Sequence, residues 1–123
     1  MNNILVPTNF SENCKKAEEL GLKMAKLYNS EIHFFHFIST PLDWVQLDKQ
    51  KENFYPETKF KIGSAKADLR ELEKKAEQQG LECRTFLEYN GGIANILSHF
   101  GHFEHDFIVT GSSGTKGGIL LKG

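Results

Sequence analysis

Short apolar segments alternate with longer amphipathic segments along this chain. The apolar segments lie at residues 4–6, 31–38, 81–89 and 106–110, and the segments between them repeat apolar residues every three or four positions. Strands that alternate with helices are typical of βαβ units, whose right-handed crossovers produce a parallel sheet. The sequence therefore predicts an α/β fold with an open, doubly wound parallel sheet and helices on both of its faces.

Local signals place the ends of the helices. Ser11 is a good N-cap for the first helix, and Gly80 is suited to follow the end of a second helix over residues 59–79. A third helix is expected before the fourth strand. Residues 39–57 predict a long, irregular connection with room for one short helix, and Trp44 within it is a candidate to shield a bound ligand.

Composition narrows the class of protein. The 123 residues argue for one domain over residues 1–123, and the net charge of -1 gives no general attraction to nucleic acid or to a membrane surface. No apolar run approaches the roughly 20 residues that a membrane-spanning helix needs. Cys14 and Cys83 lie far apart, and the N-terminus lacks the features of a secretion signal. Two free thiols in the cytoplasm are therefore expected.

Two segments follow strands at the edge of the sheet where ligands of such folds bind. They are residues 7–10, after the first strand, and residues 110–114, after the fourth. The glycine-rich stretch from Gly111 to Gly118 lets main-chain N–H groups approach a phosphate closely, although the same composition also suits a flexible turn. Its spacing is neither that of a Walker A loop nor that of the dinucleotide fingerprint.

Three parts of the chain resemble the universal stress protein family. Residues 4–11 resemble the family's opening segment, residues 36–38 its His-Val-Ile segment, and residues 106–114 its fourth strand and glycine loop. The resemblance covers essentially the whole chain in the same order. It implies an adenine-nucleotide-binding fold and a stress-response or regulatory protein that binds ATP or AMP, with Mg²⁺ accompanying ATP.

The resemblance also implies a set of binding residues. The first part of the chain would supply groups near the ribose and base, the second strand would offer main-chain atoms to adenine, and the glycine motif Gly-x2-Gly-x9-Gly-Ser/Thr would hold phosphate. A side chain at either of the first two glycines is expected to abolish nucleotide binding and to leave the fold largely intact. The implied residues are Pro7, Thr8, Asn9, Phe37, Thr110, Gly111, Gly114 and, if one residue of the motif is deleted, Gly123.

Two departures from the family pattern support an alternative function. Asn9 stands where the family usually has Asp, and the last part of the glycine motif is absent. A family member that does not bind nucleotide and acts as a dimerising interaction module is the alternative. The resemblance further implies that the C-terminal helix and fifth strand are missing, so that the domain is C-terminally incomplete and strand four forms an exposed edge. A homodimer is expected from either function.

The histidines give no clear metal site from the sequence. His99, His102 and His105 are spaced by three, like metal ligands on one face of a helix. No cysteine or carboxylate is assigned to complete the coordination shell of a metal. The pattern therefore favours solvent-exposed histidines at the end of a helix. His33 and His36 fall on opposite faces of a strand, and His36 suits a hydrogen-bonded packing residue. No catalytic constellation is visible, so no enzyme is predicted, with weak ATP hydrolysis left open. An ATP pyrophosphatase would need a Ser-Gly-Gly-rich loop after the first strand.

Overall fold

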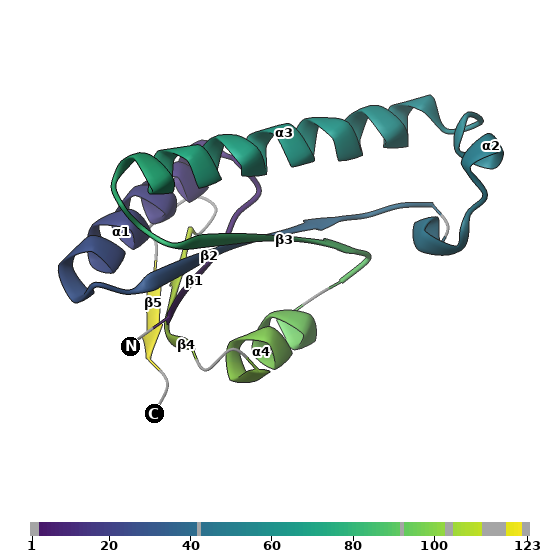
Figure 1. Cartoon of the computed structure of the whole chain (residues 1–123). Coiled ribbons are helices and arrows are strands. Elements are labelled where there is room, and N and C mark those ends of the chain that lie inside the picture. The colour runs from purple at the N-terminus through teal and green to yellow at the C-terminus, as the bar shows by residue number, and fades with distance from the viewer. Residues whose placement is uncertain (1–2, 42, 92, 103–104, 112–117, 122–123) are drawn as a thin grey trace.

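The computed structural model describes residues 3–41, 43–91, 93–102, 105–111 and 118–121 (Figure 1). Strands and helices alternate along most of the chain, as the sequence predicts. In chain order they are β1 (Asn3–Pro7), α1 (Glu12–Tyr28), β2 (Glu31–Ile38), the 3-10 helix η1 (Trp44–Gln46), α2 (Lys49–Glu52), α3 (Pro56–Gln78), β3 (Cys83–Tyr89), α4 (Ile93–His102), β4 (His105–Thr110) and β5 (Gly118–Leu121).

The strands form one sheet in the order β3-β2-β1-β4-β5. β1 pairs in parallel with β2 on one side and with β4 on the other, and β3 pairs in parallel with β2. Helices α1 and α3 cover one face of this sheet, and α4 covers the opposite face (Figure 1). The predicted parallel sheet with helices on both faces is therefore confirmed.

The central strand β1 is apolar because both of its faces are buried. Ile4 and Val6 lie in the core cluster beneath α1 and α3, which also holds Leu22 and Leu72. Leu5 points to the other face, where it packs in the cluster beneath α4. A strand that is covered on both sides needs a continuous apolar run rather than an alternating one.

The expected capping residues act as predicted. The Ser11 hydroxyl accepts a hydrogen bond of 3.3 Å from the Cys14 N–H and caps α1. Asn29 (φ 54°) ends α1 and Gly80 (φ 76°) follows α3, both in the left-handed conformation. Within the described part of the chain, none of the helices combines the length and the apolar character required to cross a membrane.

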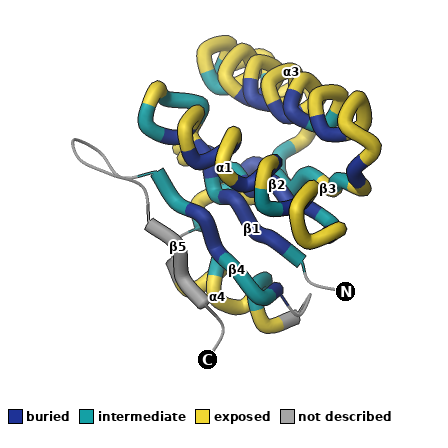
Figure 2. The backbone as a smooth tube through the Cα atoms, turned by 90° about the vertical axis from the view of Figure 1, so that its left-hand side faces the viewer, coloured by how far each residue is buried: buried dark blue, intermediate teal, exposed yellow. Residues whose placement is uncertain are grey.

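A fifth strand is present, so the prediction that it is missing is wrong. β5 pairs antiparallel with β4, with Phe107 opposite Leu121 and Thr110 opposite Gly118. It lies beside β4 at the end of the sheet, and β4 is therefore not an exposed edge (Figure 1). Part of β4 is buried and is drawn in dark blue in Figure 2. The prediction failed because it assumed a crossover helix before the last strand, whereas an antiparallel partner needs only a reversal of the chain. None of the described residues after β4 is helical.

The connection between β2 and α3 holds η1 and α2, one short helix more than expected. Trp44 in η1 is only 7 % exposed, and it packs with Ile38, Ile62 and Ala65 in a core cluster beneath α3. The Tyr55 ring lies edge-on to it at 6.2 Å. The expectation that Trp44 shields a bound ligand is therefore wrong, because its indole ring is part of the core.

Candidate functional site

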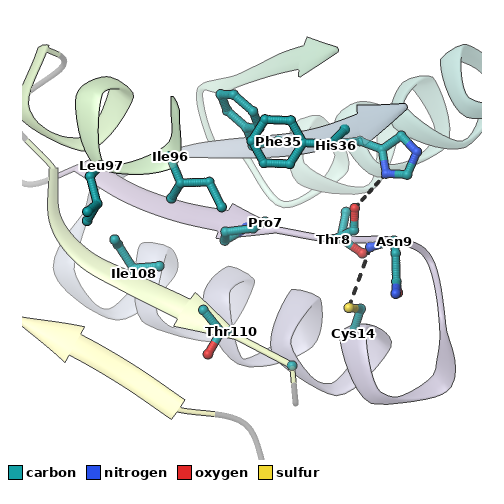
Figure 3. A pocket seen from close by; sticks show the side chains of 12 residues that line it. Pro7, Thr8, Asn9, Cys14, Phe35, His36, Ile96, Leu97, Ile108 and Thr110 are labelled. Atoms are coloured by element: carbon teal, nitrogen blue, oxygen red, sulfur yellow. Dashed lines mark hydrogen bonds between the residues drawn. The ribbon is translucent and has the colours of Figure 1, made fainter. Parts of the chain in front are cut away.

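A cavity of about 300 Å³ opens at the carboxyl ends of β1, β2 and β4, on the side of the sheet that α4 covers (Figure 3). The chain winds away from β1 in both directions, to β2 on one side and to β4 on the other. Such a switch point is where open α/β sheets bind ligands. The lining residues are Pro7, Thr8, Asn9, Cys14, Phe35, His36, Phe37, Ile96, Leu97, Ile108, Thr110 and Gly111.

The structure brings six of the eight predicted residues to this one cavity. They are Pro7, Thr8, Asn9, Phe37, Thr110 and Gly111. Gly114 and Gly123 lie outside the described residues. Sequence analysis missed the apolar wall of the cavity, to which α4 contributes Ile96 and Leu97 and β4 contributes Ile108. The only indication in the sequence was the spacing of these apolar residues within a predicted helix and a predicted strand. That spacing does not show which side of α4 faces the ends of the strands.

Thr8 organises the turn after β1. Its N–H donates to the Phe35 carbonyl at 2.8 Å, and its own carbonyl accepts a 2.7 Å hydrogen bond from His36 Nδ1. The buried Thr8 hydroxyl donates to Glu18 Oε2 at 2.5 Å and accepts from the Phe10 N–H at 3.0 Å. Because its polar groups all have partners inside the protein, Thr8 shapes the cavity wall as a positioning residue. The contact with His36 also confirms that this histidine is a hydrogen-bonded packing residue.

Asn9 lies at the rim of the cavity and at the start of α1. Its side-chain oxygen accepts a hydrogen bond of 3.0 Å from the Ser11 N–H, which fixes the side chain beside the first turn of the helix. The Asn9 N–H lies 3.5 Å from Cys14 Sγ. The following residue, Phe10, has φ 65°, a left-handed conformation that is rare for an aromatic residue and that costs backbone strain. This turn therefore directs Asn9 to the positive end of the α1 dipole.

Gly111 is required for close packing at the end of β4. A Cβ atom at this position would lie 2.7 Å from the Asn13 carbonyl oxygen and 2.8 Å from Cys14 Cα. These are main-chain atoms of α1, which cannot turn aside as a flexible side chain can. The expectation that Gly111→Val leaves the fold largely intact is therefore wrong.

The buried carboxyl group of Glu18 gives a pH-dependent prediction. Burial raises its pKa above the ordinary value, and the hydrogen bond from Thr8 and the charge of Lys75 only partly offset this effect. A raised pKa means that the contribution of Glu18 to stability is complete below the unfolded-state value of 4.5 and is lost as the pH rises through the folded-state value. We therefore expect Glu18→Gln to gain stability over the wild type as the pH rises.

Urea unfolding of the two proteins at several pH values between about 4 and 8 measures this difference. Glu19→Gln, at the exposed neighbouring position, is the matched control and should show no such trend. A constant difference between wild type and Glu18→Gln across the series would contradict the assigned cause.

Three histidines meet near the other end of the strands. His33 of β2 and His105 of β4 are both fully buried, and His99 of α4 is half-buried beside them. The expectation of exposed histidines is wrong for His99 and His105, while the side chain of His102 lies outside the described residues. Burial lowers the pKa of both His33 and His105 to about 4. Sequence analysis missed His33 because it comes from a strand far away in the chain.

Comparison with known proteins gives a family match over nearly the whole chain. The model of the universal stress protein family matches residues 1–122. No curated protein sequence matches the chain.

Solved structures of universal stress proteins share the fold. The universal stress protein UspA from Lactobacillus plantarum has a TM-score of 0.74 and 20% identity, with 93% of this chain and 79% of that chain covered. A family member from Arabidopsis thaliana with AMP bound has a TM-score of 0.65 and 17% identity, with coverage of 93% and 78%. A universal stress protein in complex with cAMP has a TM-score of 0.58 and 12% identity, with coverage of 87% and 69%.

Proposed function

We propose that this chain, which belongs to the universal stress protein family, binds an adenine nucleotide in the cavity at the ends of β1, β2 and β4. The observation that carries the proposal is the convergence of residues from three strand ends and from α4 on one cavity at the switch point of the sheet. Two proteins of similar fold, one with AMP bound and one in complex with cAMP, support the same class of ligand.

The apolar part of the cavity suits a flat base. Ile96 and Leu97 of α4 approach from one side and Ile108 of β4 from the other (Figure 3). Apolar walls that leave space between them can bury both faces of a purine ring, while a few polar groups fix its orientation. The base is therefore assigned to the space between α4 and β4.

In this proposal the main chain of Phe37 supplies the polar contacts of the base. Residues two apart in a strand direct their main-chain groups to the same side, and the Phe35 carbonyl faces β1 because it accepts from the Thr8 N–H. The pairing of β1 with β2 ends at Pro7 opposite Phe35. The main-chain N–H and C=O of Phe37 thus point past the end of β1, where an adenine edge would need one donor and one acceptor.

The polar rim suits the sugar and phosphate. Asn9 and Gly111 line the rim beside the first turn of α1, where the helix dipole and main-chain N–H groups favour an anion. The single phosphate of AMP needs little more than the amino end of α1 as its binding group. ATP would bring Mg²⁺, and its further phosphates would extend beyond Gly111. AMP and ATP are therefore the two ligands to compare. We propose no catalytic step at this site.

Calorimetric titration with AMP and ATP, and with GMP for base selectivity, tests the proposal. Leu97 is 55 % exposed at the mouth of the cavity, so Leu97→Glu should add a negative charge there without disturbing the core. We expect adenine nucleotide affinity to fall at least about tenfold, because a carboxylate removes apolar contact and repels phosphate. Leu27→Glu makes the same change at a position that is 76 % exposed on α1 and does not line the cavity, and it should bind as the wild type does.

Three results would count against the nucleotide site. They are the absence of adenine nucleotide binding by the wild type, equal affinity of Leu97→Glu and wild type, or equal losses in the Leu97 and Leu27 variants.

We expect Asn9→Asp to strengthen adenine nucleotide binding. One carboxylate oxygen can keep the contact with the Ser11 N–H, and the second then becomes a charged acceptor for a ribose hydroxyl. The gain should be on the order of 1 kcal/mol, or about fivefold in affinity. Calorimetry with AMP measures it, and titration with 2′,3′-dideoxyadenosine monophosphate should show no gain. Weaker AMP binding by Asn9→Asp would show that the amide is suited to another ligand.

The alternative function is a dimerising interaction module that binds no nucleotide. β5 is the terminal strand of the described sheet, so one of its edges is not paired within it. An edge strand can pair with a second subunit, and we propose a homodimer on this basis in either function. Light scattering measures the mass, and heat release followed by chromatography detects a copurified nucleotide. A dimer that neither carries nor binds nucleotide would favour the alternative, whereas a monomer would remove the homodimer. A cytoplasmic location stays a prediction from the sequence.

A further inference from the structure

Three imidazole rings from three different elements face one another on the α4 side of the sheet. The centroids of the His33 and His105 rings are 4.5 Å apart, and the His99 ring lies 5.7 Å from the first and 5.1 Å from the second. One nitrogen atom from each ring can be chosen so that all three lie within 4.8 Å of one another. The three side chains thus form a compact cluster of nitrogen ligands.

An irregularity in the sheet brings His105 into this cluster. His105 precedes Ile108 by three residues, so strict alternation would place their side chains on opposite faces. The pairing of β1 with β4 shifts register between Asn3 and Ile4, with His105 opposite Asn3 and Phe107 opposite Ile4. The extra residue lets His105 face α4 as Ile108 does, and a bulge of this kind is a known means of redirecting a side chain.

Each outer nitrogen of the two buried histidines has an oxygen acceptor nearby, within hydrogen-bond distance for His105 and slightly beyond it for His33. His105 Nδ1 lies 3.3 Å from the Phe100 carbonyl oxygen, which can only accept. His33 Nε2 lies 3.6 Å from the carboxylate of Glu31, which is held by Arg84 Nε at 3.0 Å. A metal-ligating histidine usually has such a carbonyl or carboxylate group at its other nitrogen, where it fixes the tautomer and the ring orientation.

The inner nitrogens of the same two rings face each other. His105 Nε2 and His33 Nδ1 are 2.8 Å apart. When the protons occupy the outer nitrogens, which is what the two acceptors favour, both inner nitrogens present lone pairs to the same point. A cation beside the two rings satisfies both lone pairs once the two nitrogens separate to the roughly 3.3 Å that two tetrahedral Zn–N bonds require. A proton can be shared between them only if one ring gives up its preferred tautomer or becomes charged.

We propose that His33, His99 and His105 bind a divalent first-row transition-metal cation of the Zn²⁺ type. Imidazole nitrogen is a ligand that such cations prefer, and three of them leave the fourth position of a tetrahedral site for water. Neutral imidazole, with one ring nitrogen unprotonated, is the form of histidine that binds a metal. Phe86 and Phe35 pack edge-on against His99 at 4.2 and 5.0 Å and hold its ring in place.

The proposed metal site is distinct from the nucleotide cavity. None of the three histidines lines that cavity, and Phe35 both lines the cavity and packs against the His99 ring. His33 and His105 lie near the amino ends of β2 and β4, whereas the cavity opens at the carboxyl ends. Metal binding can therefore be measured in the absence of nucleotide.

The test uses the full chain without affinity-tag histidines, after treatment with a chelator. Zn²⁺ is titrated in competition with a chromophoric chelator, and Co²⁺ is titrated while its visible absorption is followed. We expect one equivalent of metal per chain, a tetrahedral Co²⁺ spectrum, and an increase in thermal stability with Zn²⁺, because a metal that binds only the folded state stabilises it.

Three variants separate metal binding from packing. His99→Phe keeps an aromatic ring but no ligand, and it should lower Zn²⁺ affinity at least about tenfold and abolish the Co²⁺ spectrum. Glu31→Gln leaves the three ligands in place but removes the carboxylate beside His33, and it should weaken binding about 10–100-fold. His36→Gln removes a histidine of the same strand outside the cluster, and it should leave metal binding unchanged.

The proposal is overturned if wild type and a folded His99→Phe bind Zn²⁺ equally, or if His36→Gln abolishes the binding. Circular dichroism shows whether His99→Phe is folded. Should it be unfolded, an unchanged Zn²⁺ affinity of Glu31→Gln would overturn the proposal instead.

Discussion

Gly111→Ala is expected to lower the free energy of unfolding by about 1–3 kcal/mol, the usual cost of forcing an extra methyl group into a packed region. The methyl group would lie 2.7 Å from the Asn13 carbonyl oxygen and 2.8 Å from Cys14 Cα. Both are main-chain atoms of α1, so relief requires the end of β4 to move away from the helix. Gly111→Val should cost more, because its two additional methyl groups face the same obstacle.

Gly63→Ala is the matched control for this prediction. Gly63 lies in α3, where a Cβ atom would meet nothing within 4 Å. Alanine should therefore raise the free energy of unfolding there by about 0.5–1 kcal/mol, because it restricts the unfolded chain and favours the helix. Urea unfolding of both variants should show changes of opposite sign in the free energy of unfolding. Equal effects at the two positions would show that β4 and α1 do not pack as closely as described.

The same contact changes how a binding experiment at Gly111 must be interpreted. A loss of nucleotide affinity in Gly111→Val would combine displacement of β4 with any block of phosphate approach. Leu97→Glu and Asn9→Asp are better tests, because both side chains are exposed and neither change enters the core. Gly111 is therefore first a packing residue, and its role toward phosphate stays a proposal.

Much of the fold could be predicted because its signals are local. The apolar run of β1 indicates a strand that is buried on both faces. Ser11 indicates where a helix starts, and Gly80 indicates a residue in the left-handed conformation after a helix. β5 was not predicted because four residues carry too little periodicity, and because the family pattern places a helix before the last strand. β5 supplies the main-chain hydrogen-bonding partner for the outer edge of β4. That β4 requires such a partner becomes clear only once the order of the strands in the sheet is known.

The candidate site was predictable in part for the same reason. Residues that follow strands, such as Asn9 and Thr110, can be placed at the sheet edge from the order of elements alone. The faces of α4 that meet the sheet depend on tertiary packing, so Leu97 was not assigned to the cavity. The histidine cluster could not be predicted from the sequence, because His105 comes close to His33 only through a register shift between β1 and β4. No local sequence pattern indicates that shift.

Removing β5 should have the second large effect. A chain that stops after Gly117 would lose the four residues that pair with β4 from Phe107 to Thr110. Main-chain hydrogen bonds contribute about 0.5–1.5 kcal/mol each, so the loss of several should lower the free energy of unfolding by roughly 2–4 kcal/mol. The uncovered edge of β4 would also present unpaired N–H and C=O groups to other chains. We therefore expect the shortened protein to associate with rising concentration beyond the dimer proposed for the full chain, as measured by light scattering.

A chain that stops after Leu121 is the control, because it loses two residues but keeps β5. It should match the full chain in both its free energy of unfolding and its state of association. If both shortened proteins behave alike, β5 contributes little and β4 tolerates an open edge. If only the shorter one associates beyond a dimer, the pairing of β5 with β4 protects the edge of the sheet next to the proposed nucleotide cavity. Nucleotide affinity measured on the two proteins then shows whether this protection also keeps Thr110 and Gly111 in place, since both follow directly from the end of the strand that β5 supports.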